Sequence, residues 1–352
     1  MEVLIHNFLV SFPTWGLILL VAISLYTLSK GADILVDEAV SLSIHWGVPK
    51  MIIGATIVSL GTTLPEASVS VIAAFNGNPD LALGNAIGSI IADTGLILGL
   101  AALIGKLPVD RIIVERQGKI QVWSGLLLAI VCLPFFSKGS TGNISQVIGW
   151  LFIGLLIAYI YVSIKWSKSS SSNEIVSTPN TSDPTVESTS SESVLIEEKS
   201  PIILQILKLI AGIVIVICSS KILIPSVEIT AIRVGIPQSI IAATLIAFGT
   251  SLPELVTAIT AVRKGHGELA IGNIVGADIL NVLFVVGGAA AVTKGGLQVP
   301  LNFYKLQIPT MVIILTTFRL FARGQNEEIT KKEGFVLFSI YIIYIVLNYT
   351  WI

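Results

Sequence analysis

Charge is scarce in this chain, and so are the residues of soft metal sites. Charged side chains make up 12% of the 352 residues, about half the share found in soluble globular proteins. There are three histidines, and the two cysteines, Cys132 and Cys218, lie far apart in apolar stretches, where cysteine usually packs as a small hydrophobe. No nucleophile–base pair or cofactor motif appears. We therefore expect no soluble enzyme, no disulfide, no cofactor and no nucleic-acid partner.

Long apolar stretches are present instead. Hydrophobic residues make up 53% of the chain, and the mean hydropathy is +0.88. Stretches of about twenty apolar residues are long enough to cross a bilayer as helix. The segment before Phe12 has no basic region and no cleavage site, so no removable signal peptide is predicted. We predict an all-α polytopic membrane protein with about ten transmembrane helices, near Trp15–Ser41, Met51–Phe75, Leu81–Ile104, Val122–Phe136, Val147–Trp166, Ile202–Ile232, Ser239–Val262, Leu269–Val292, Leu306–Phe321 and Phe335–Trp351.

One polar segment divides the chain into two halves. Residues 167–200 are mostly Ser, Thr, Glu, Pro and Asn, a composition that cannot bury enough apolar surface to fold. We predict a disordered linker there, between a first five-helix half, residues 1–166, and a second, residues 201–352.

The distribution of basic residues predicts the orientation. Lysine and arginine follow the third, fifth, seventh and ninth apolar stretches, with Arg111, Arg116 and Lys119 in the connection after the third. The alternate connections are poor in positive charge. The positive-inside rule then places the linker in the cytoplasm and both termini outside, with the protein in the plasma membrane (the inner membrane of the cell).

An internal repeat is the strongest pattern in the sequence. A shift of 188 residues aligns residues 54–99 with residues 242–287 without a gap, and roughly a third of the aligned positions are identical. Each half has five predicted helices, an odd number, so the second copy must cross the membrane in the opposite sense. Such inverted repeats place a binding site where they meet, near mid-membrane.

Each copy carries a carboxylate at membrane depth. Glu66 and Glu254 lie well inside apolar stretches, where a charge is costly unless it faces a cavity, is paired or holds a cation. A buried glutamate satisfied by neighbouring hydroxyls is the alternative. The recurrence of the glutamate in both halves favours the cation site.

The motif before each glutamate predicts a broken helix. Gly61-Thr62-Thr63-Leu64-Pro65 matches Gly249-Thr250-Ser251-Leu252-Pro253. Proline removes an N–H and clashes with the carbonyl four residues back, and we expect the glycines to let the backbone bend. Non-helical backbone at this depth is tolerated where it lines a site or is buried in protein, and a plain structural kink is the alternative. We expect freed carbonyls to point inward at Ser59, Ala247, Thr62 and Thr250.

The next helix of each half adds polar groups on one face. Its GNxxG segments, residues 84–88 and 272–276, favour helix packing. Asp93 lies one turn beyond Ser89, and Asn281 one turn beyond Ala277. Together with the glutamates, hydroxyls and freed carbonyls they form a set of oxygen ligands. Such a set suits hard cations such as Ca²⁺ and Na⁺ and does not favour soft transition metals.

At these residues the chain resembles the calcium/cation antiporter superfamily, specifically its prokaryotic sodium/calcium exchanger branch. GTTLPE with GNAIGS, and GTSLPE with GNIVGA, are similar to the two repeats of that family. The resemblance implies alternating-access exchange of Na⁺ for Ca²⁺, which are bound as transported substrates around four central sites. The ligand positions it implies are Glu66, Glu254, Thr62, Thr250, their neighbours Thr63 and Ser251, Ser89, and the carboxylate/amide pair Asp93 and Asn281.

Two residues depart from the family pattern. Ala277 stands where a serine is usual and removes a hydroxyl, and Asp278 is a carboxylate where an amide is more usual. Both changes bear on ion selectivity and stoichiometry. We interpret Asp278 as a helix-interface residue, with a supplementary proton or cation role as the alternative.

Other transport functions stay open at this point. Within the superfamily they are H⁺/Ca²⁺ exchange and K⁺-dependent exchange, and outside it a cation channel. The expected partners are the transported ions and the lipid bilayer, with the protein as a monomer or a weak homo-oligomer.

Overall fold

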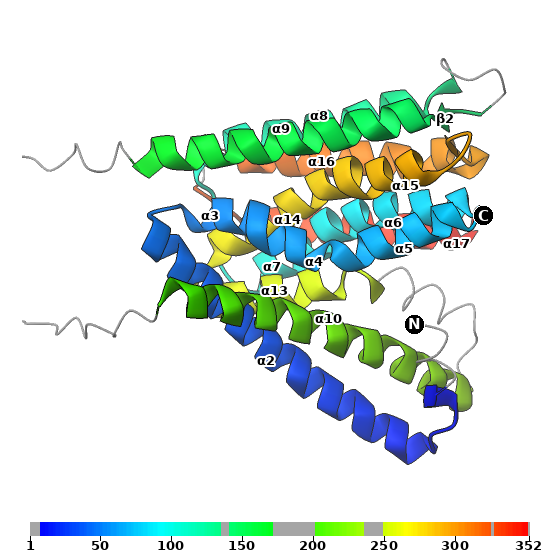
Figure 1. Ribbon diagram of the computed structural model, residues 1–352, viewed down its shortest axis with the longest axis horizontal. Coiled ribbons are helices and arrows are strands. Elements are labelled where there is room, and N and C mark those ends of the chain that lie inside the picture. Colours follow the sequence, from blue (N-terminus) through cyan, green and yellow to red (C-terminus); the bar gives the residue numbers. More distant parts are fainter. Residues whose placement is uncertain (1–7, 135–140, 172–200, 236–248, 325–326, 351–352) are drawn as a thin grey trace, which may run out of the picture.

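Helices make up nearly all of the structure, a computed structural model (Figure 1). It describes the chain except residues 1–7, 135–140, 172–200, 236–248, 325–326 and 351–352. The described elements of the first half are α2 (Thr14–Trp46), α3 (Lys50–Ile53), η1 (Gly54–Val58), α4 (Ser59–Thr62), α5 (Leu64–Phe75), α6 (Pro79–Ile91), η2 (Ala92–Ile97), α7 (Leu98–Ile104), β1 (Leu107–Pro108), α8 (Arg111–Cys132), β2 (Asn143–Ile144) and α9 (Gln146–Ser171). Those of the second half are α10 (Ile202–Arg233), α13 (Leu252–Arg263), α14 (Gly267–Leu280), η6 (Asn281–Val286), α15 (Gly287–Val292), β3 (Leu297–Gln298), η7 (Phe303–Gln307), α16 (Ile308–Ala322), β4 (Glu328–Ile329) and α17 (Lys331–Thr350).

Several of these helices have the length and apolarity of membrane spans. Among the described residues, six helices are long and apolar enough to cross a membrane, and the bent pair formed by residues 50–62 and α5 would give a seventh. The polytopic all-α membrane fold is thus confirmed. The total of about ten spans stays a prediction, because α8, α13 and α17 do not meet the same standard.

The helices α2 and α10 run side by side, tilted against the rest of the bundle (Figure 1). Glycine lets them approach closely. A Cβ on Gly31 of α2 would lie 2.7 Å from Cγ2 of Ile215, and a Cβ on Gly212 of α10 would lie 2.8 Å from the backbone nitrogen of Leu35. No larger residue fits at either position unless the helices separate, so α2 and α10 form one unit.

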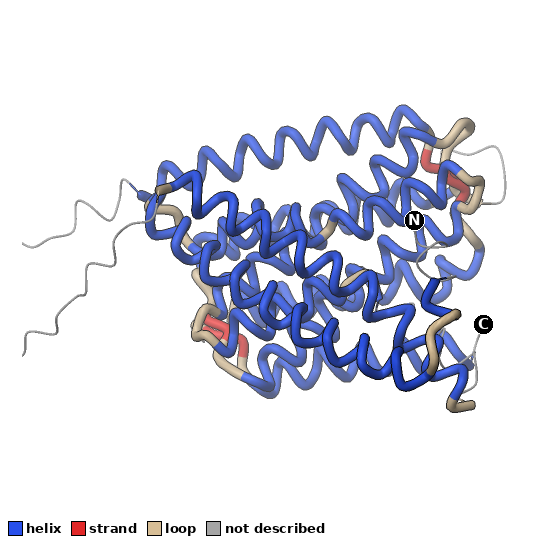
Figure 2. Tube along the Cα trace, turned by 60° about the horizontal axis from the view of Figure 1, so that its bottom comes forward, coloured by secondary structure: helices blue, strands red, loops and turns tan. Residues whose placement is uncertain are grey.

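The two halves of the chain interlock. Helix α9 of the first half packs on α15 and η6 of the second, and α17 of the second half packs on α7 and η2 of the first. Strand β1 pairs antiparallel with β4, and β2 pairs antiparallel with β3. These two strand pairs lie at opposite ends of the molecule (Figure 2). Each contact has a counterpart with the halves exchanged, as inverted repeats predict.

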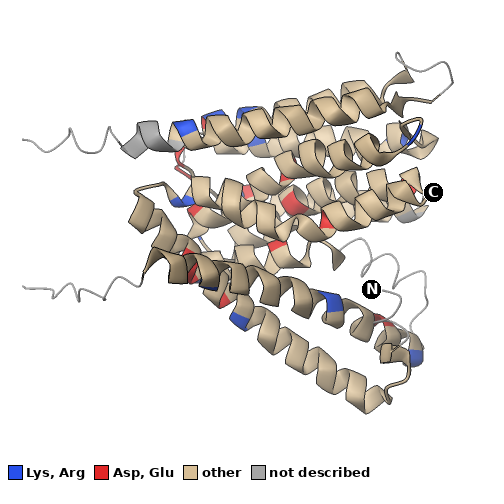
Figure 3. Cartoon of the chain, in the orientation of Figure 1, with Lys and Arg blue, Asp and Glu red and all other residues tan. Residues whose placement is uncertain are grey.

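The start of α8 differs from the expectation. The sequence predicts Arg111, Arg116 and Lys119 in a connection, but they lie in the first three turns of this helix. Lys119 pairs with Glu115 at 2.8 Å, and Arg116 lies over the ring of Trp166 on α9. Because these side chains are paired or lie over an aromatic ring, the helix can begin with charged residues before its apolar part starts. Figure 3 shows basic positions gathered toward the end of the bundle where α9 ends and α10 begins.

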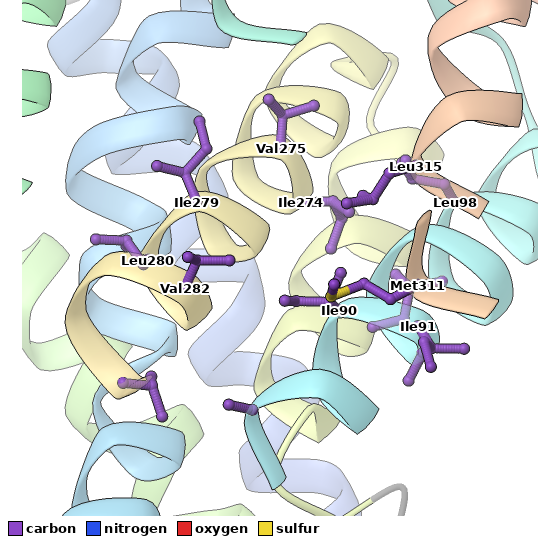
Figure 4. Packing of buried hydrophobic residues seen from close by; sticks show 14 of the residues in the cluster. Ile90, Ile91, Leu98, Ile274, Val275, Ile279, Leu280, Val282, Met311 and Leu315 are labelled. Atoms are coloured by element: carbon purple, nitrogen blue, oxygen red, sulfur yellow. The ribbon is translucent and has the colours of Figure 1, made fainter. Parts of the chain in front are cut away.

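The spans differ in how deeply they are enclosed. In the apolar part of α14–α15, 94% of the residues are buried inside the protein, against 28% for each of α2, α9 and α10. Side chains from α6 (Ile90), α14 (Ile274) and α16 (Met311) pack in one hydrophobic core (Figure 4). The two repeats therefore hold the centre, and α2, α9 and α10 expose apolar side chains outward, as expected of helices that face lipid.

Candidate cation-binding site

The helix break predicted at the first GTTLPE segment is present. Helix α4 ends at Thr62 and α5 begins at Leu64, with a bend of 45° between them. Pro65 stands in the first turn of α5, where its missing N–H costs no helical hydrogen bond. In the second copy, Ser251 before α13 has nearly the same backbone conformation (φ −85°, ψ 9°) as Thr63 before α5 (φ −80°, ψ −3°). Ala247 lies outside the described residues.

The two glutamates occupy equivalent places at these breaks. Glu66 is in the first turn of α5 and Glu254 in the first turn of α13, and each is 1% exposed. The partial positive charge of a helix N-terminus stabilises a carboxylate there. Thr63 Oγ1 donates to Glu254 Oε1 at 3.4 Å. The break in the first repeat therefore touches the glutamate of the second.

Many oxygens around the glutamates lack hydrogen-bond donors. Among the described residues, both carboxylate oxygens of Glu66 and Asp93, Oε2 of Glu254 and Oδ1 of Asn281 are buried without a partner. Buried polar atoms in proteins are almost always paired with protein, water or an ion. This concentration of bare acceptor oxygens fits a site for hard cations.

The carboxylates are spaced rather than gathered on one point. Glu66 is repelled by the charges of Glu254 and Asp93, and Asp93 by those of Glu254 and Asp278. In the described part of the chain, no three acidic, histidine or cysteine side chains come close enough to hold one metal ion by themselves. A cation bound here must therefore take hydroxyl, amide or backbone oxygens as well.

Asp93 and Asn281 lie at the starts of two π-helical segments. Helix α6 passes into η2 at Ala92, and α14 passes into η6 at Asn281. π-helical turns are rare and are frequently found at functional sites. Both side chains are 1% exposed, and Ser89, one turn before Asp93, is 2% exposed. The structure thus places the predicted carboxylate/amide pair at equivalent positions of the two repeats.

Two asparagines that the sequence analysis did not select join the repeats. Thr250 Oγ1 donates to Asn85 Oδ1 at 3.0 Å, and Thr62 Oγ1 donates to Asn273 Oδ1 at 3.4 Å. Asn85 Nδ2 also donates to the backbone oxygen of Glu66 at 3.2 Å. Each asparagine orients a threonine of the opposite repeat. The sequence feature that could have pointed to these two residues is the asparagine present in both GNxxG segments.

The carbonyl of Ser59 is not freed by the break. It accepts the N–H of Thr63 at 2.9 Å and Oγ1 of Thr62 at 3.4 Å. The expectation of a freed carbonyl is wrong at this residue, because Thr63 still closes the last turn of α4. A ligand role for Ser59 stays a prediction.

The glycines of the two motifs lie in close contact with α10. Neither Gly61 nor Gly249 has a positive φ. A Cβ on Gly61 would lie 2.5 Å from Cδ1 of Ile213, and a Cβ on Gly249 would lie 3.1 Å from Cδ1 of Ile224. Both isoleucines belong to α10. Their role in bending stays a prediction, and the contacts add a packing role: these glycines let α10 pass close to both motifs.

The packing role expected for the GNxxG glycines is confirmed in the second copy but not in the first, where a Cβ on Gly88 would meet no described atom within 4 Å. A Cβ on Gly272 would lie 2.1 Å from the carbonyl oxygen of Met51, and one on Gly276 would lie 2.4 Å from that of Ala55. Helix α14 therefore approaches α3 and η1 backbone to backbone. This contact brings the second repeat against the broken helix of the first.

Known proteins share these features. The sodium/calcium exchanger protein family matches residues 16–165 and 204–350. The chain is 29% identical over 327 residues to the putative antiporter CaxA of Alkalimonas amylolytica, covering 92% of this chain and 96% of that one. It is 27% identical over 349 residues to the sodium/calcium exchanger MaX1 of Methanosarcina acetivorans, covering 93% and 97%. The fold matches that of the sodium-calcium exchanger NCX_Mj with a TM-score of 0.75 at 25% identity, over 95% of this chain and 97% of that one. The chain belongs to the sodium/calcium exchanger protein family.

Proposed function

We propose that this protein is a secondary antiporter that exchanges Na⁺ for Ca²⁺ by alternating access. The observation that carries the proposal is the group of buried oxygens without donors on Glu66, Glu254 and Asp93. The relatives support the choice of ions, because MaX1 and NCX_Mj are named as sodium/calcium exchangers.

The chemistry of the site favours exchange over co-transport. Ca²⁺ takes six to eight oxygen ligands, so it would need Glu66, Glu254 and the hydroxyls beside them together. Na⁺ ions bound at the same oxygens would have to leave first. The carboxylates repel one another, so a site without any cation is costly in the membrane interior. After one ion has been released, the protein therefore has to bind the other ion before the site can become accessible from the opposite side again.

The unit of α2 and α10 is the element proposed to move. Ile213 and Ile224 of α10 lie over Gly61 and Gly249, one at each break. They are separated by three turns, about 16 Å along the helix. Apolar side chains over glycine offer few polar contacts that would oppose sliding. Movement of this unit along the bundle would expose the site first to one side and then to the other.

The proposed location is the plasma membrane, with the linker in the cytoplasm and both termini outside. The basic residues near the linker end of the bundle support this orientation. Among them are Arg111, Arg116 and Lys119 in the first turns of α8, and Lys331 and Lys332 at the start of α17.

The test is uptake of ⁴⁵Ca²⁺ into proteoliposomes that contain the purified full chain. An outward Na⁺ gradient is expected to drive uptake, and K⁺ or H⁺ gradients of the same size are not. Uptake driven by the H⁺ gradient alone would replace Na⁺ by H⁺ as the coupling ion. Ca²⁺ flux that continues without any counter-ion on the far side would indicate a channel and contradict the proposal.

A further inference from the structure

A fourth buried carboxylate lies beside the exchange site. Asp278 on α14 is 1% exposed. Its Oδ2 accepts two hydrogen bonds, from Thr94 Oγ1 at 2.5 Å and from Gln121 Nε2 at 2.6 Å. Its Oδ1 is buried and has no partner among the described residues. Asp278 is therefore at a helix interface, as the sequence predicted, but the contacts of that interface leave one oxygen bare.

The surroundings of Asp278 hold a second bare oxygen and join the exchange site. Gln121 on α8 is fully buried, and its Oε1 also lacks a partner in the described structure. The amide nitrogen of Gln121 donates to Asp278. The unpartnered oxygen of Gln121 therefore belongs to the same amide group that contacts the Asp278 carboxylate. Thr94 directly follows Asp93 in η2, and Asp93 is repelled by the charge of Asp278. The two sites are neighbours.

Comparison of the repeats shows what Asp278 replaces. The shift of 188 residues aligns Asn281 with Asp93, and Asp278 with Ile90. Ile90 is fully buried in the hydrophobic core (Figure 4). The second repeat thus lacks a carboxylate at position 281 and has one a turn earlier. Each half contributes two buried carboxylates, Glu66 and Asp93 in the first, Glu254 and Asp278 in the second.

No buried base balances these four carboxylates in the part of the chain that the structure describes. Arg319 is the buried basic side chain there, and it is bonded to the carbonyl of Val114 and to Glu115 on α8. Two neutral donors stabilise Asp278 only in part, and an uncompensated buried charge is expensive. A bound cation would supply the missing charge.

We propose that Asp278 and Gln121 bind a sodium ion of their own beside the exchange site. This inference rests on the proposed Na⁺/Ca²⁺ exchange and deepens it. One carboxylate and one neutral amide oxygen give the low charge that suits a monovalent hard cation, whereas Ca²⁺ requires six to eight oxygens. Asp278 therefore adds one Na⁺ to the number that the chain binds.

The test is equilibrium binding of ²²Na⁺ to the purified full chain without Ca²⁺. Asp278→Asn removes the charge but keeps an oxygen that can accept from Thr94 and Gln121. It is expected to bind one Na⁺ fewer per chain and to retain ⁴⁵Ca²⁺ binding, because Glu66 and Glu254 are intact. Asp278→Glu keeps the charge and should keep the full number. Asp80→Asn, which removes an exposed acid at the start of α6, is the matched control and should bind as many Na⁺ as the unmodified chain.

An unchanged Na⁺ number in Asp278→Asn overturns the inference, including the case in which only the pH dependence moves and the group holds a proton. If both Asp278→Asn and Asp278→Glu lose Na⁺ binding and Ca²⁺ binding together, the inference is also overturned. That result would mean that Asp278 is needed for the structure of the protein and not as a Na⁺ ligand. Na⁺-driven ⁴⁵Ca²⁺ uptake by the unmodified chain is measured separately. Failure of that uptake contradicts the proposed function, whereas failure of the binding count contradicts only the Asp278 site.

Discussion

Glu66 and Glu254 come from different halves of the chain but have the same local setting. Each lies in the first turn of a helix that starts at a break, and each keeps at least one bare carboxylate oxygen. The helix N-terminus favours a charged carboxylate at both positions, while burial and, at Glu66, the neighbouring carboxylates oppose the charge. From this balance we predict that these residues depend on a bound cation rather than on protein donors.

Replacement of Glu66 by glutamine tests that dependence. The amide keeps the size of the side chain but removes a charge and one strong Ca²⁺ ligand. We expect Na⁺-driven ⁴⁵Ca²⁺ uptake to fall by about a hundredfold or more, because a lost ligand charge in a low-dielectric site is worth several kcal/mol. Uptake is measured in proteoliposomes with equal protein content.

Glu328→Gln is the matched control for this measurement. Glu328 is an exposed glutamate in β4, remote in sequence from both motifs, and its replacement should leave uptake within about twofold, as is usual for exposed positions. Full uptake by Glu66→Gln would show that this carboxylate is no ligand.

At the scale of elements, an ion-pair cluster ties α2 to the end of α13 near the linker. Lys264 Nζ lies 2.8 Å from Asp37 Oδ2 and 3.3 Å from Asp33 Oδ1. Partial burial lowers the pKa of Lys264, but the two hydrogen-bonded aspartates outweigh it and raise the pKa above the ordinary 10.5. A raised lysine pKa contributes stability at every pH below the ordinary value and loses it as the pH rises through the raised one. The cluster is therefore intact at neutral pH.

Lys264→Gln should loosen this end of α2. Each exposed ion pair is worth about 1 kcal/mol or less, so the population with α2 separated from α13 should rise by about two- to fivefold. Spin labels at Ile44 of α2 and Arg263 of α13 would report it as a longer, broader distance distribution. Lys30→Gln is the control, because Lys30 pairs with Asp33 within α2 itself. If Lys264→Gln and Lys30→Gln gave the same distance distribution, the ion pairs of Lys264 would not be what holds α2 against α13.

The contact of α14 with the first repeat is a second property of elements. Gly272→Ala places a methyl group 2.1 Å from the carbonyl oxygen of Met51, and backbone on both sides leaves little room to adjust. We expect destabilisation of about 3 kcal/mol or more, the upper range for overpacking, seen as a lower unfolding temperature in detergent. Gly154→Ala on α9 meets no described atom within 4 Å and should melt like the unmodified chain. Equal melting of the two variants would refute this packing argument.

At the scale of the whole molecule, the repeat made the candidate site predictable. A 188-residue shift selected Glu66, Glu254, Asp93 and Asn281 as candidate ligands without any contact information, because a costly buried polar group that recurs in both halves favours a shared function. The structure buries all four side chains, and their role as ligands stays a prediction. Hydropathy placed most spans but not the start of α8, because it registers only the apolar part of a helix. The partners of Asn85 and Asp278 could not be foreseen, since helical spacing gives a face but not the element it meets.

The interlocking of the halves leads to a prediction for a divided chain. Helices α9 and α17 each pack on the opposite half, and both strand pairs join the halves. Residues 1–171 and 201–352, expressed together as two chains, should therefore assemble and recover Na⁺-driven ⁴⁵Ca²⁺ uptake, because association is carried by packing between helices in the membrane. Either half alone should show none, since each holds one of the two glutamates. Absence of uptake from the pair, with both halves present in the membrane, would mean that the covalent connection is needed for assembly.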